Sequence, residues 1–189
     1  MVTEEPSFEI PTIPASAGAL LFDRDDRLLI VKPNYKSGWT IPGGMMEADG
    51  ETPWEACRRE VVEETGLIVE TGRLVIVDFL RPRGHKRGGM RFLFDCGGFD
   101  DSFFDHIALQ AEEISAYQLA ARATALDLLS GPLRRRVSAS FDTDGCGYLE
   151  DGLPVSGVGT KSGFASASRG LEHADQFDVL GHGEQVEGP

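Results

Sequence analysis

Three glutamates, Glu60, Glu63 and Glu64, are the residues of this sequence whose type and spacing could do chemistry. Residues 52–65 have a helical composition and are followed by Gly66, a residue typical of helix C-termini. On such a helix the three carboxylates fall within an arc of about 100°, so they crowd one face and repel one another. A bound cation would relieve this repulsion, and Mg²⁺ prefers carboxylate oxygens together with water and substrate phosphate. The helix alone is also consistent with a solvated, charged face.

An apolar stripe next to these carboxylates predicts that the helix is fixed to a core. Trp54, Cys57 and Val61 recur at helical spacing beside the acidic face. The carboxylates would then stand at the edge of a packed element.

The segment before the helix favours a functional site over a merely solvated face. Gly43 and Gly44 allow the chain to approach a ligand or metal without an intervening side chain. Glu51 precedes Arg59 by eight residues, and an ion pair between them could tie the loop to the helix.

In these residues the sequence resembles the Nudix hydrolase family, whose signature is G-x5-E-x7-R-E-U-x-E-E-x-G-U, with U a bulky aliphatic residue. The second part of the signature matches throughout, at Glu51, Arg59, Glu60, Val61, Glu63, Glu64, Gly66 and Leu67. The first part departs, because six residues rather than five separate Gly44 from Glu51, as though Gly50 were inserted. An insertion in the loop affects the aim of the Gly44 carbonyl more than it affects the helix.

The resemblance implies an α/β fold, a Nudix-type α/β/α sandwich with a mixed β-sheet, over residues 15–155. It implies that Mg²⁺ or Mn²⁺ is bound by Glu60, Glu63 and Glu64 with the Gly44 carbonyl, and that Arg59 orients Glu51. The implied reaction is hydrolysis of the diphosphate linkage in a nucleoside diphosphate derivative, by attack of water on phosphorus.

The general base differs between members of the family, and the sequence leaves it open. The candidates are Glu63 and Glu64 in the helix, and Glu112 and Glu113 before a short apolar segment. Glu112 and Glu113 are equally well explained as solvated loop acids.

A basic segment and one tryptophan are the candidates for contacting substrate. Residues 81–91 hold five of the eighteen cations and no acid. Within them we predict phosphate contacts from Arg81, Arg83, Lys86 and Arg87, with a solvated hairpin tip as the alternative. Trp39 could stack on a base, although an ordinary core position explains it as well.

Apolar runs and turn residues predict a layered α/β arrangement. Residues 15–32 form two apolar runs around a polar turn, as in a hairpin. Residues 33–44 are expected to be a loop. Further strands are expected at 67–80, 90–99 and 114–120, and a last hairpin at 147–155 with its turn at Asp151 and Gly152.

Residues 123–137 predict a helix that is interrupted or restarted at Pro132. The arginines at 134–136 are expected on its solvated face, with some benefit from the helix dipole. Residues 1–14 are expected to be an N-terminal extension, and residues 156–189, which contain few large hydrophobic side chains, a disordered tail.

Composition restricts the class of protein and of partner. A chain of 189 residues can bury one good core, and a net charge of −13 argues against a chain-wide surface for nucleic acid or anionic membrane. Three cysteines without a C-x-x-C pair, no signal-like N-terminus and no long apolar stretch favour the cytoplasm. We expect a small nucleotide diphosphate as partner, and a homodimer stays open.

A second hypothesis belongs to a different functional class. The altered loop leaves room for a Nudix-fold module that has lost catalysis and senses a nucleotide for regulation. Phosphate release from nucleoside diphosphate derivatives would separate the two hypotheses.

Overall fold

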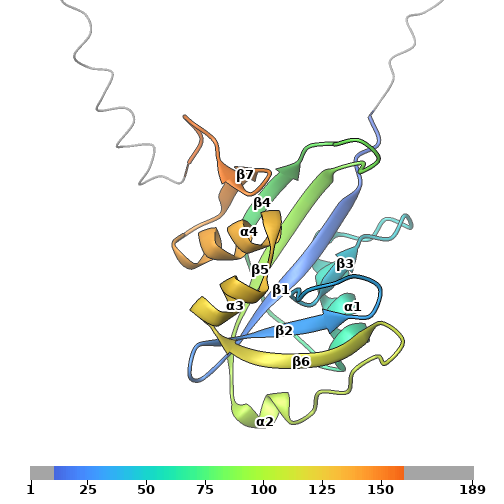
Figure 1. The fold of residues 1–189 in the computed structure, drawn as a ribbon, viewed down its shortest axis with the longest axis vertical. Coiled ribbons are helices and arrows are strands. Elements are labelled where there is room, and N and C mark those ends of the chain that lie inside the picture. Colours follow the sequence, from blue (N-terminus) through green and yellow to red (C-terminus); the bar gives the residue numbers. More distant parts are fainter. Residues whose placement is uncertain (1–10, 160–189) are drawn as a thin grey trace, which may run out of the picture.

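A computed structural model describes residues 11–159 of the chain, and its centre is a mixed β-sheet (Figure 1). Most of the predicted extension at 1–14 and of the predicted tail at 156–189 lies outside the described residues. The strands are β1 (Ala15–Asp23), β2 (Arg27–Pro33), β3 (Gly43–Met45), β4 (Arg73–Leu80), β5 (Gly89–Phe99), β6 (Ile114–Ala121), β7 (Gly147–Glu150) and β8 (Leu153–Pro154).

The strand order is β6-β2-β1-β5-β4-β7-β8, and β3 pairs with the first half of β1. The pairs β1–β5 and β4–β7 are parallel, whereas the other pairs are antiparallel. The mixed sheet that the sequence predicted is therefore confirmed.

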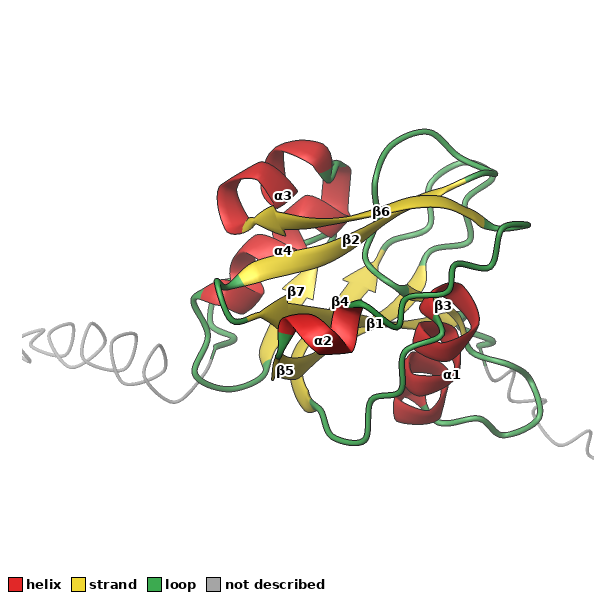
Figure 2. Ribbon diagram, turned by 90° about the horizontal axis from the view of Figure 1, so that it is seen from below, coloured by secondary structure: helices red, strands yellow, loops and turns green. Residues whose placement is uncertain are grey.

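Helices lie on both faces of this sheet (Figure 2). They are α1 (Pro53–Thr65), α2 (Asp101–Phe104), α3 (Arg122–Leu128) and α4 (Gly131–Phe141). Helix α1 lies on the side of the sheet opposite to α3 and α4, which gives the predicted three-layer sandwich.

Alternation along β1 divides the core between the two faces, since successive side chains of a strand point to opposite sides. Leu20 and Phe22 belong to the hydrophobic cluster that includes α3 and α4. Ala19 and Leu21 belong to the cluster that includes α1. Strand β1 is thus the central element on which both layers pack.

Most predicted elements are present with shifted limits. The hairpin at 15–32, the helix after Thr52 and the hairpin at 147–155 are confirmed, and Asp151 and Gly152 adopt the positive φ angles of 54° and 75° that a tight hairpin turn requires. The strand predicted at 67–80 begins only at Arg73. The restart predicted at Pro132 is confirmed, because α4 begins at Gly131 with Pro132 in its first turn. The sequence did not predict β3 or α2. No helix within residues 11–159 is long and apolar enough to cross a membrane.

Candidate active site

Helix α1 begins and ends on capping residues that its local sequence specifies. The Thr52 side chain accepts a hydrogen bond from the Glu55 N–H, and the Glu55 carboxylate accepts one from the Thr52 N–H, which forms a capping box. Pro53 occupies the first turn, and Gly66 ends the helix with a left-handed φ of 71°. These caps fix which residues of α1 face the sheet and which face outward.

The apolar stripe of α1 holds the helix on the sheet as predicted. Cys57 and Val61 are fully buried, and Trp54 packs against Phe94 with ring centroids 5.1 Å apart. The acidic face of α1 therefore stands at a fixed distance from β1 and β3.

Arg59 joins the loop to the helix, which confirms the predicted ion pair with Glu51. Its Nε and Nη2 donate to the two Glu51 carboxylate oxygens at 2.8 and 3.1 Å. Its Nη1 donates to Glu60 and to Glu63, both at 2.9 Å, and its Nη2 also donates to the Met45 carbonyl at 3.0 Å. The extra residue in the loop between Gly44 and Glu51 does not prevent the Glu51–Arg59 pair from forming.

The two glycines of β3 lie directly against two glutamates of α1. The Gly43 N–H donates to Glu64 Oε2 at 2.9 Å. A Cβ atom at Gly44 would overlap the Glu60 carboxylate, so only glycine fits this carboxylate against β3. The structure thus brings together Gly44, Glu60 and Glu64, all of which were predicted as metal ligands.

Burial dominates the electrostatics of these carboxylates. Glu64 is only 2% exposed, and burial, opposed by the Gly43 N–H and reinforced by the charge of Glu60, raises its pKa to about 7. Burial also raises the pKa of Glu60, against the opposing effect of the Arg59 hydrogen bond. Both shifts mean that the ionised carboxylates are unfavourable without a compensating cation.

The donor set fits a hard divalent cation, although its present geometry does not enclose one. Within residues 11–159, no three His, Cys, Asp or Glu side chains converge around a point that would hold a metal ion. The reason is visible at Arg59, whose guanidinium occupies an oxygen of Glu60 and one of Glu63. A buried and a partly buried carboxylate with raised pKa values, next to a glycine cradle, are the chemistry that Mg²⁺ compensates. The fit therefore requires Glu60 and Glu63 to exchange the guanidinium for the ion.

The loop between β2 and β3 and the turn before β6 lie near this carboxylate cluster. Besides burial and Glu60, the charge of Glu113 raises the pKa of Glu64, whereas the charge of Lys36 opposes that rise. The pKa of Tyr35 is raised first by partial burial and then by the charges of Glu64, Glu113 and Glu60. Tyr35, Lys36 and Glu113 therefore lie near the cluster, and the Asn34 N–H connects their segments by donating to the Glu113 carbonyl at 2.7 Å.

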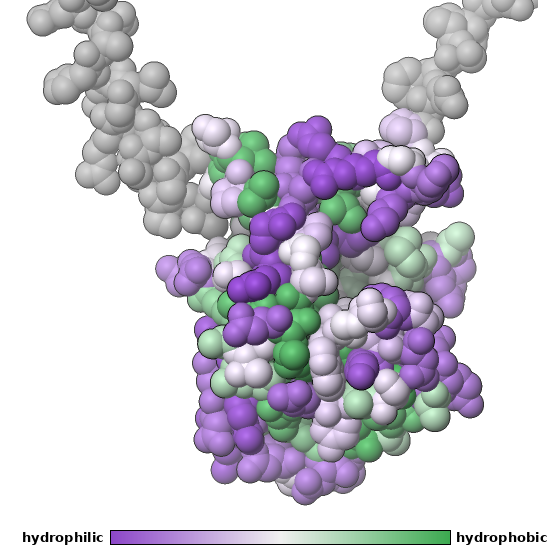
Figure 3. Space-filling model, in the orientation of Figure 1, coloured by the Kyte–Doolittle hydropathy of each residue, from purple (hydrophilic) through white to green (hydrophobic). Residues whose placement is uncertain are grey.

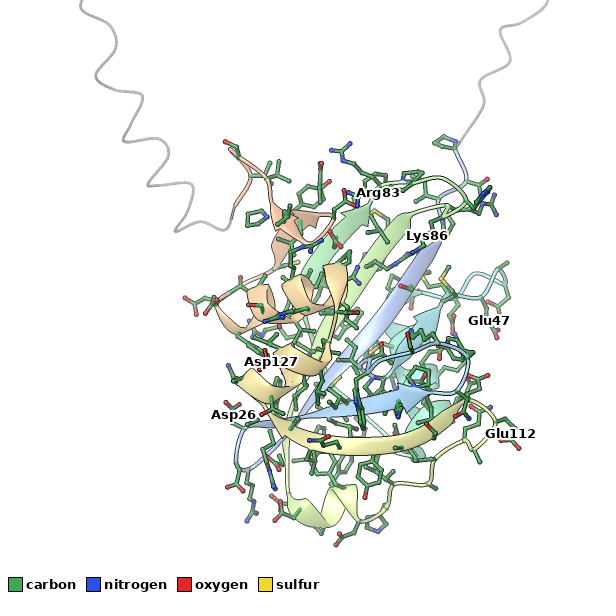
Figure 4. The ribbon with its side chains drawn as sticks, in the orientation of Figure 1. Asp26, Glu47, Arg83, Lys86, Glu112 and Asp127 are labelled. Carbon is green, nitrogen blue, oxygen red and sulfur yellow. The ribbon has the colours of Figure 1, made fainter. Side chains whose placement is uncertain are left out.

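The two neighbouring acids of this turn are placed differently. The charge of Glu113 is among the main causes that raise the pKa values of Glu60 and Glu64, and Glu112 is not among them. Figure 4 shows Glu112 at the outer edge of the molecule. Of the two loop acids left open by the sequence, Glu113 is the one beside the cluster.

A pocket of about 320 Å³ adjoins β3 on the α4 side of the sheet. Its walls come from β1, β5, α4, β3 and the loop between β2 and β3. Among its lining residues are Ser16, Tyr35, Lys36, Gly43, Gly44, Arg91 and Arg136. The volume is within the range of small-molecule sites.

The predicted phosphate-binding cations lie at the tip of the β4–β5 hairpin, where hydrophilic residues gather (Figure 3). Arg81 pairs with Glu150, and Arg83 Nη2 lies 2.7 Å from Asp151 Oδ2. Lys86 is exposed at the same tip as Arg83 (Figure 4), and Arg87 is exposed beside it. None of the four lines the pocket, and their contact with substrate stays a prediction.

Trp39 and Arg136 of α4 contact segments that are distant from them in sequence. Trp39 is partly buried against the hydrophobic cluster that includes α3 and α4, as expected for a core position. The expectation of a solvated face at 134–136 is wrong for Arg136, which is 8% exposed and donates from Nη1 to Asp78 Oδ2 at 3.0 Å. All three arginines also lie in the first half of α4, so the expected dipole benefit is absent.

Sequence reasoning missed Tyr35, Lys36 and Arg136 as members of the site. The one available signal for the first two was their position in the Gly- and Pro-rich segment before Gly43. For Arg136 no local signal existed, because its partner Asp78 is 58 residues away.

Comparisons with known proteins find a family match over most of the chain. The family model described as NUDIX domain matches residues 12–135. The chain is 38% identical over 78 residues to the ADP-ribose pyrophosphatase of Methanocaldococcus jannaschii, a match that covers 38% of this chain and 46% of that protein. It is 35% identical over 86 residues to a MutT-like protein of Streptomyces ambofaciens, covering 46% of this chain and 53% of that protein. The chain thus spans about half the length of these curated relatives.

A solved structure shows the same fold. The MutT protein from Methanosarcina mazei Go1 superposes with a TM-score of 0.59 at 23% identity, over 72% of this chain and 97% of that one. At this identity the likeness concerns the fold alone.

Proposed function

We propose that this chain, which belongs to the NUDIX domain family, hydrolyses the diphosphate linkage of a nucleoside diphosphate derivative. The observation that carries this proposal is the contact of the Glu60 and Glu64 carboxylates with Gly44 and Gly43, two glycines that line the pocket. A diphosphate lying across β3 would contact the carboxylate cluster while the rest of the substrate fills the pocket.

Glu60, Glu63 and Glu64 would hold Mg²⁺ or Mn²⁺, with the Gly44 carbonyl as a further oxygen ligand. Bound there, the ion would neutralise diphosphate charge and lower the pKa of a water molecule. Glu64 is held by the Gly43 N–H, and Arg59 keeps Glu51 and the end of β3 in register with α1. The contacts of Gly43 and Arg59 therefore hold Glu64 and the loop beside α1, and the ion would take the place of the Arg59 guanidinium at Glu60 and Glu63.

Glu113 is our choice of general base among Glu63, Glu64, Glu112 and Glu113. In the proposed step it takes a proton from water while the water oxygen bonds to phosphorus and the bridging oxygen leaves. The choice is supported by the effect of its charge, which raises the pKa values of Glu60 and Glu64, and by the absence of an ion pair to Glu113 within residues 11–159. Glu63 is less suitable because it is paired with Arg59.

Lys36 is better placed than the β4–β5 loop to contact the reacting phosphates. It lines the pocket and acts electrostatically on Glu64, whereas Arg81 and Arg83 are paired with acids of the β7–β8 hairpin. Tyr35, exposed beside it, offers an aromatic face at the mouth of the pocket.

The pocket volume favours a small molecule over a nucleic acid, in keeping with the net charge of −13. The similarity to an ADP-ribose pyrophosphatase makes ADP-ribose the first compound to test. We retain the cytoplasm as the proposed compartment, since all three cysteines are free.

The decisive experiment measures product formation from a panel of nucleoside diphosphate derivatives with Mg²⁺, with Mn²⁺ and with EDTA. Hydrolysis that requires a divalent ion is expected. Binding of these compounds without any hydrolysis would instead support the catalytically inactive sensing module.

A further inference from the structure

A row of polar side chains crosses three strands at the end of the pocket that α4 covers. Arg91 of β5 is the register partner of Ser16 on β1 and of Asp78 on β4. Side chains in register on neighbouring strands share one face of the sheet. Arg136 reaches this face from α4 and contacts Asp78.

Only one of the two arginines of this row is paired with a carboxylate in the described residues. Asp78 is fully buried, and its two oxygens accept from Arg136 Nη1 at 3.0 Å and from the Gly152 N–H at 2.9 Å. Arg91 donates to neutral acceptors, the carbonyls of Met90 at 2.8 Å and Gly88 at 3.1 Å. Within the part of the chain that the structure describes, no carboxylate lies within 4.0 Å of Arg91, so this end of the pocket carries one excess positive charge.

This excess charge is held at an energetic disadvantage. Burial lowers the pKa of Arg91 and of Arg136, although both guanidinium groups stay protonated at neutral pH. Among residues 11–159, the buried Nε of Arg136 finds no hydrogen-bond acceptor. Buried donors without partners are uncommon, and a charged one is especially costly. An anion in the pocket would balance this charge.

Both arginines line the same pocket as Gly43, Gly44 and Lys36. One end of the pocket thus adjoins the carboxylate cluster, and the other carries the guanidinium pair. A ligand whose diphosphate lies against β3 would extend its non-reacting part towards Arg91 and Arg136.

We propose that Arg91 and Arg136 form an anion subsite for a second, non-reacting anionic group of the substrate. The substrate class is then a nucleoside diphosphate derivative that carries an additional phosphate monoester or carboxylate, groups whose oxygens match the guanidinium fork. This inference rests on the proposed function, because it names the substrate class of the same site.

The test uses two matched pairs of compounds that differ by one anionic group. ADP-ribose 2′-phosphate is compared with ADP-ribose, and UDP-glucuronate with UDP-glucose. We expect kcat/KM to be at least about tenfold higher for the anionic member of one pair, as a charge-assisted hydrogen bond would give. The pair that shows the preference identifies the group as phosphate or carboxylate.

Variants then locate the preference. Arg91→Gln should abolish it, mainly through KM, and Arg91→Lys should restore part of it. Arg134→Gln is the matched control, because Arg134 lies on the same helix as Arg136 but is exposed and paired with Asp127. The preference should survive in that control.

Dissociation constants of the four wild-type complexes in EDTA separate this inference from the proposed function. Tighter binding of an anionic member without hydrolysis under any metal condition would support the subsite and contradict the hydrolase. Hydrolysis with equal kcat/KM within both pairs would overturn the subsite and leave the hydrolase standing. Equal or absent binding within both pairs would also overturn the subsite, even if Arg91→Gln fails to fold.

Discussion

The Gly43 N–H donates a hydrogen bond to Glu64 Oε2 at 2.9 Å, and this contact joins β3 to α1. It fixes one oxygen of a buried carboxylate and leaves the other available. Gly43 and Gly44 also line the pocket, so the same short strand adjoins both the carboxylates and the proposed substrate space.

Removing the Glu64 charge should stabilise the metal-free protein, and more so at high pH. The pKa of Glu64 is raised to about 7 in the folded chain, above its usual value of 4.5. Below pH 4.5 the carboxyl is protonated in both the folded and the unfolded chain and does not affect stability. Between pH 4.5 and 7 the free energy of unfolding falls as pH rises, and above pH 7 the full destabilisation is present. Glu64→Gln should therefore match wild type near pH 4.5 and exceed it at pH 8 by up to about 3 kcal/mol.

Urea unfolding in EDTA at both pH values measures this difference. The glutamine keeps an oxygen that accepts from the Gly43 N–H, so the comparison isolates the charge. A variant that is less stable than wild type at pH 8 would show that Glu64 acts as a structural ion-pair partner.

Replacement of Glu113 and of Glu112, the two acids of the turn before β6, should change kcat unequally. Glu113→Gln should lower kcat by about 10²- to 10⁴-fold, because a general base contributes an effect of that size. Glu112→Gln is the matched control and should change kcat by less than about twofold, as expected for a solvated residue. If the two variants are equally active, the base is a glutamate of α1.

Lys36 and Lys86 provide a comparison between the pocket and the hairpin tip. Lys36→Gln should raise KM more than it lowers kcat, since a cation beside the phosphates contributes mainly ground-state binding. Lys86→Gln, at the exposed tip, should change KM little. Steady-state kinetics of both variants measure the two KM values. A larger increase in KM for Lys86→Gln than for Lys36→Gln would assign phosphate binding to the β4–β5 loop, as the sequence predicted.

Gly44 should tolerate no side chain without loss of activity. A Cβ at this position overlaps the Glu60 carboxylate, so Gly44→Ala must displace a proposed metal ligand. We expect a folded protein whose kcat/KM is reduced by about tenfold or more. Gly98→Ala is the control, because a Cβ there meets no atom closer than 4.0 Å. Wild-type activity in Gly44→Ala would mean that Glu60 can leave β3 without consequence.

The sequence predicted those parts of the site that depend on local chemistry. The Gly66 cap, the Cys57–Val61 stripe and the Glu51–Arg59 pair all follow from spacing along one helix and its loop. These features need only the geometry of a helix and of its termini.

The remaining parts depend on contacts between distant segments. Tyr35 and Lys36 join the site because the turn at Glu113 packs on their loop, some 77 residues away in sequence at the Asn34–Ala111 hydrogen bond. Arg136 appeared to be one of three similar helix arginines, yet its burial is decided by Asp78 on β4. No periodicity within α4 carries that information, because the partner is chosen by strand order.

The most direct test of the account is the divalent-metal dependence of turnover in Glu64→Gln beside wild type. The account predicts that this variant folds, as measured by its melting temperature, and that its kcat with Mg²⁺ falls by about 100-fold or more, because a direct ligand of the proposed ion has lost its charge. A folded variant that retains wild-type turnover with Mg²⁺ would contradict the assignment of the α1 carboxylates as the catalytic metal site.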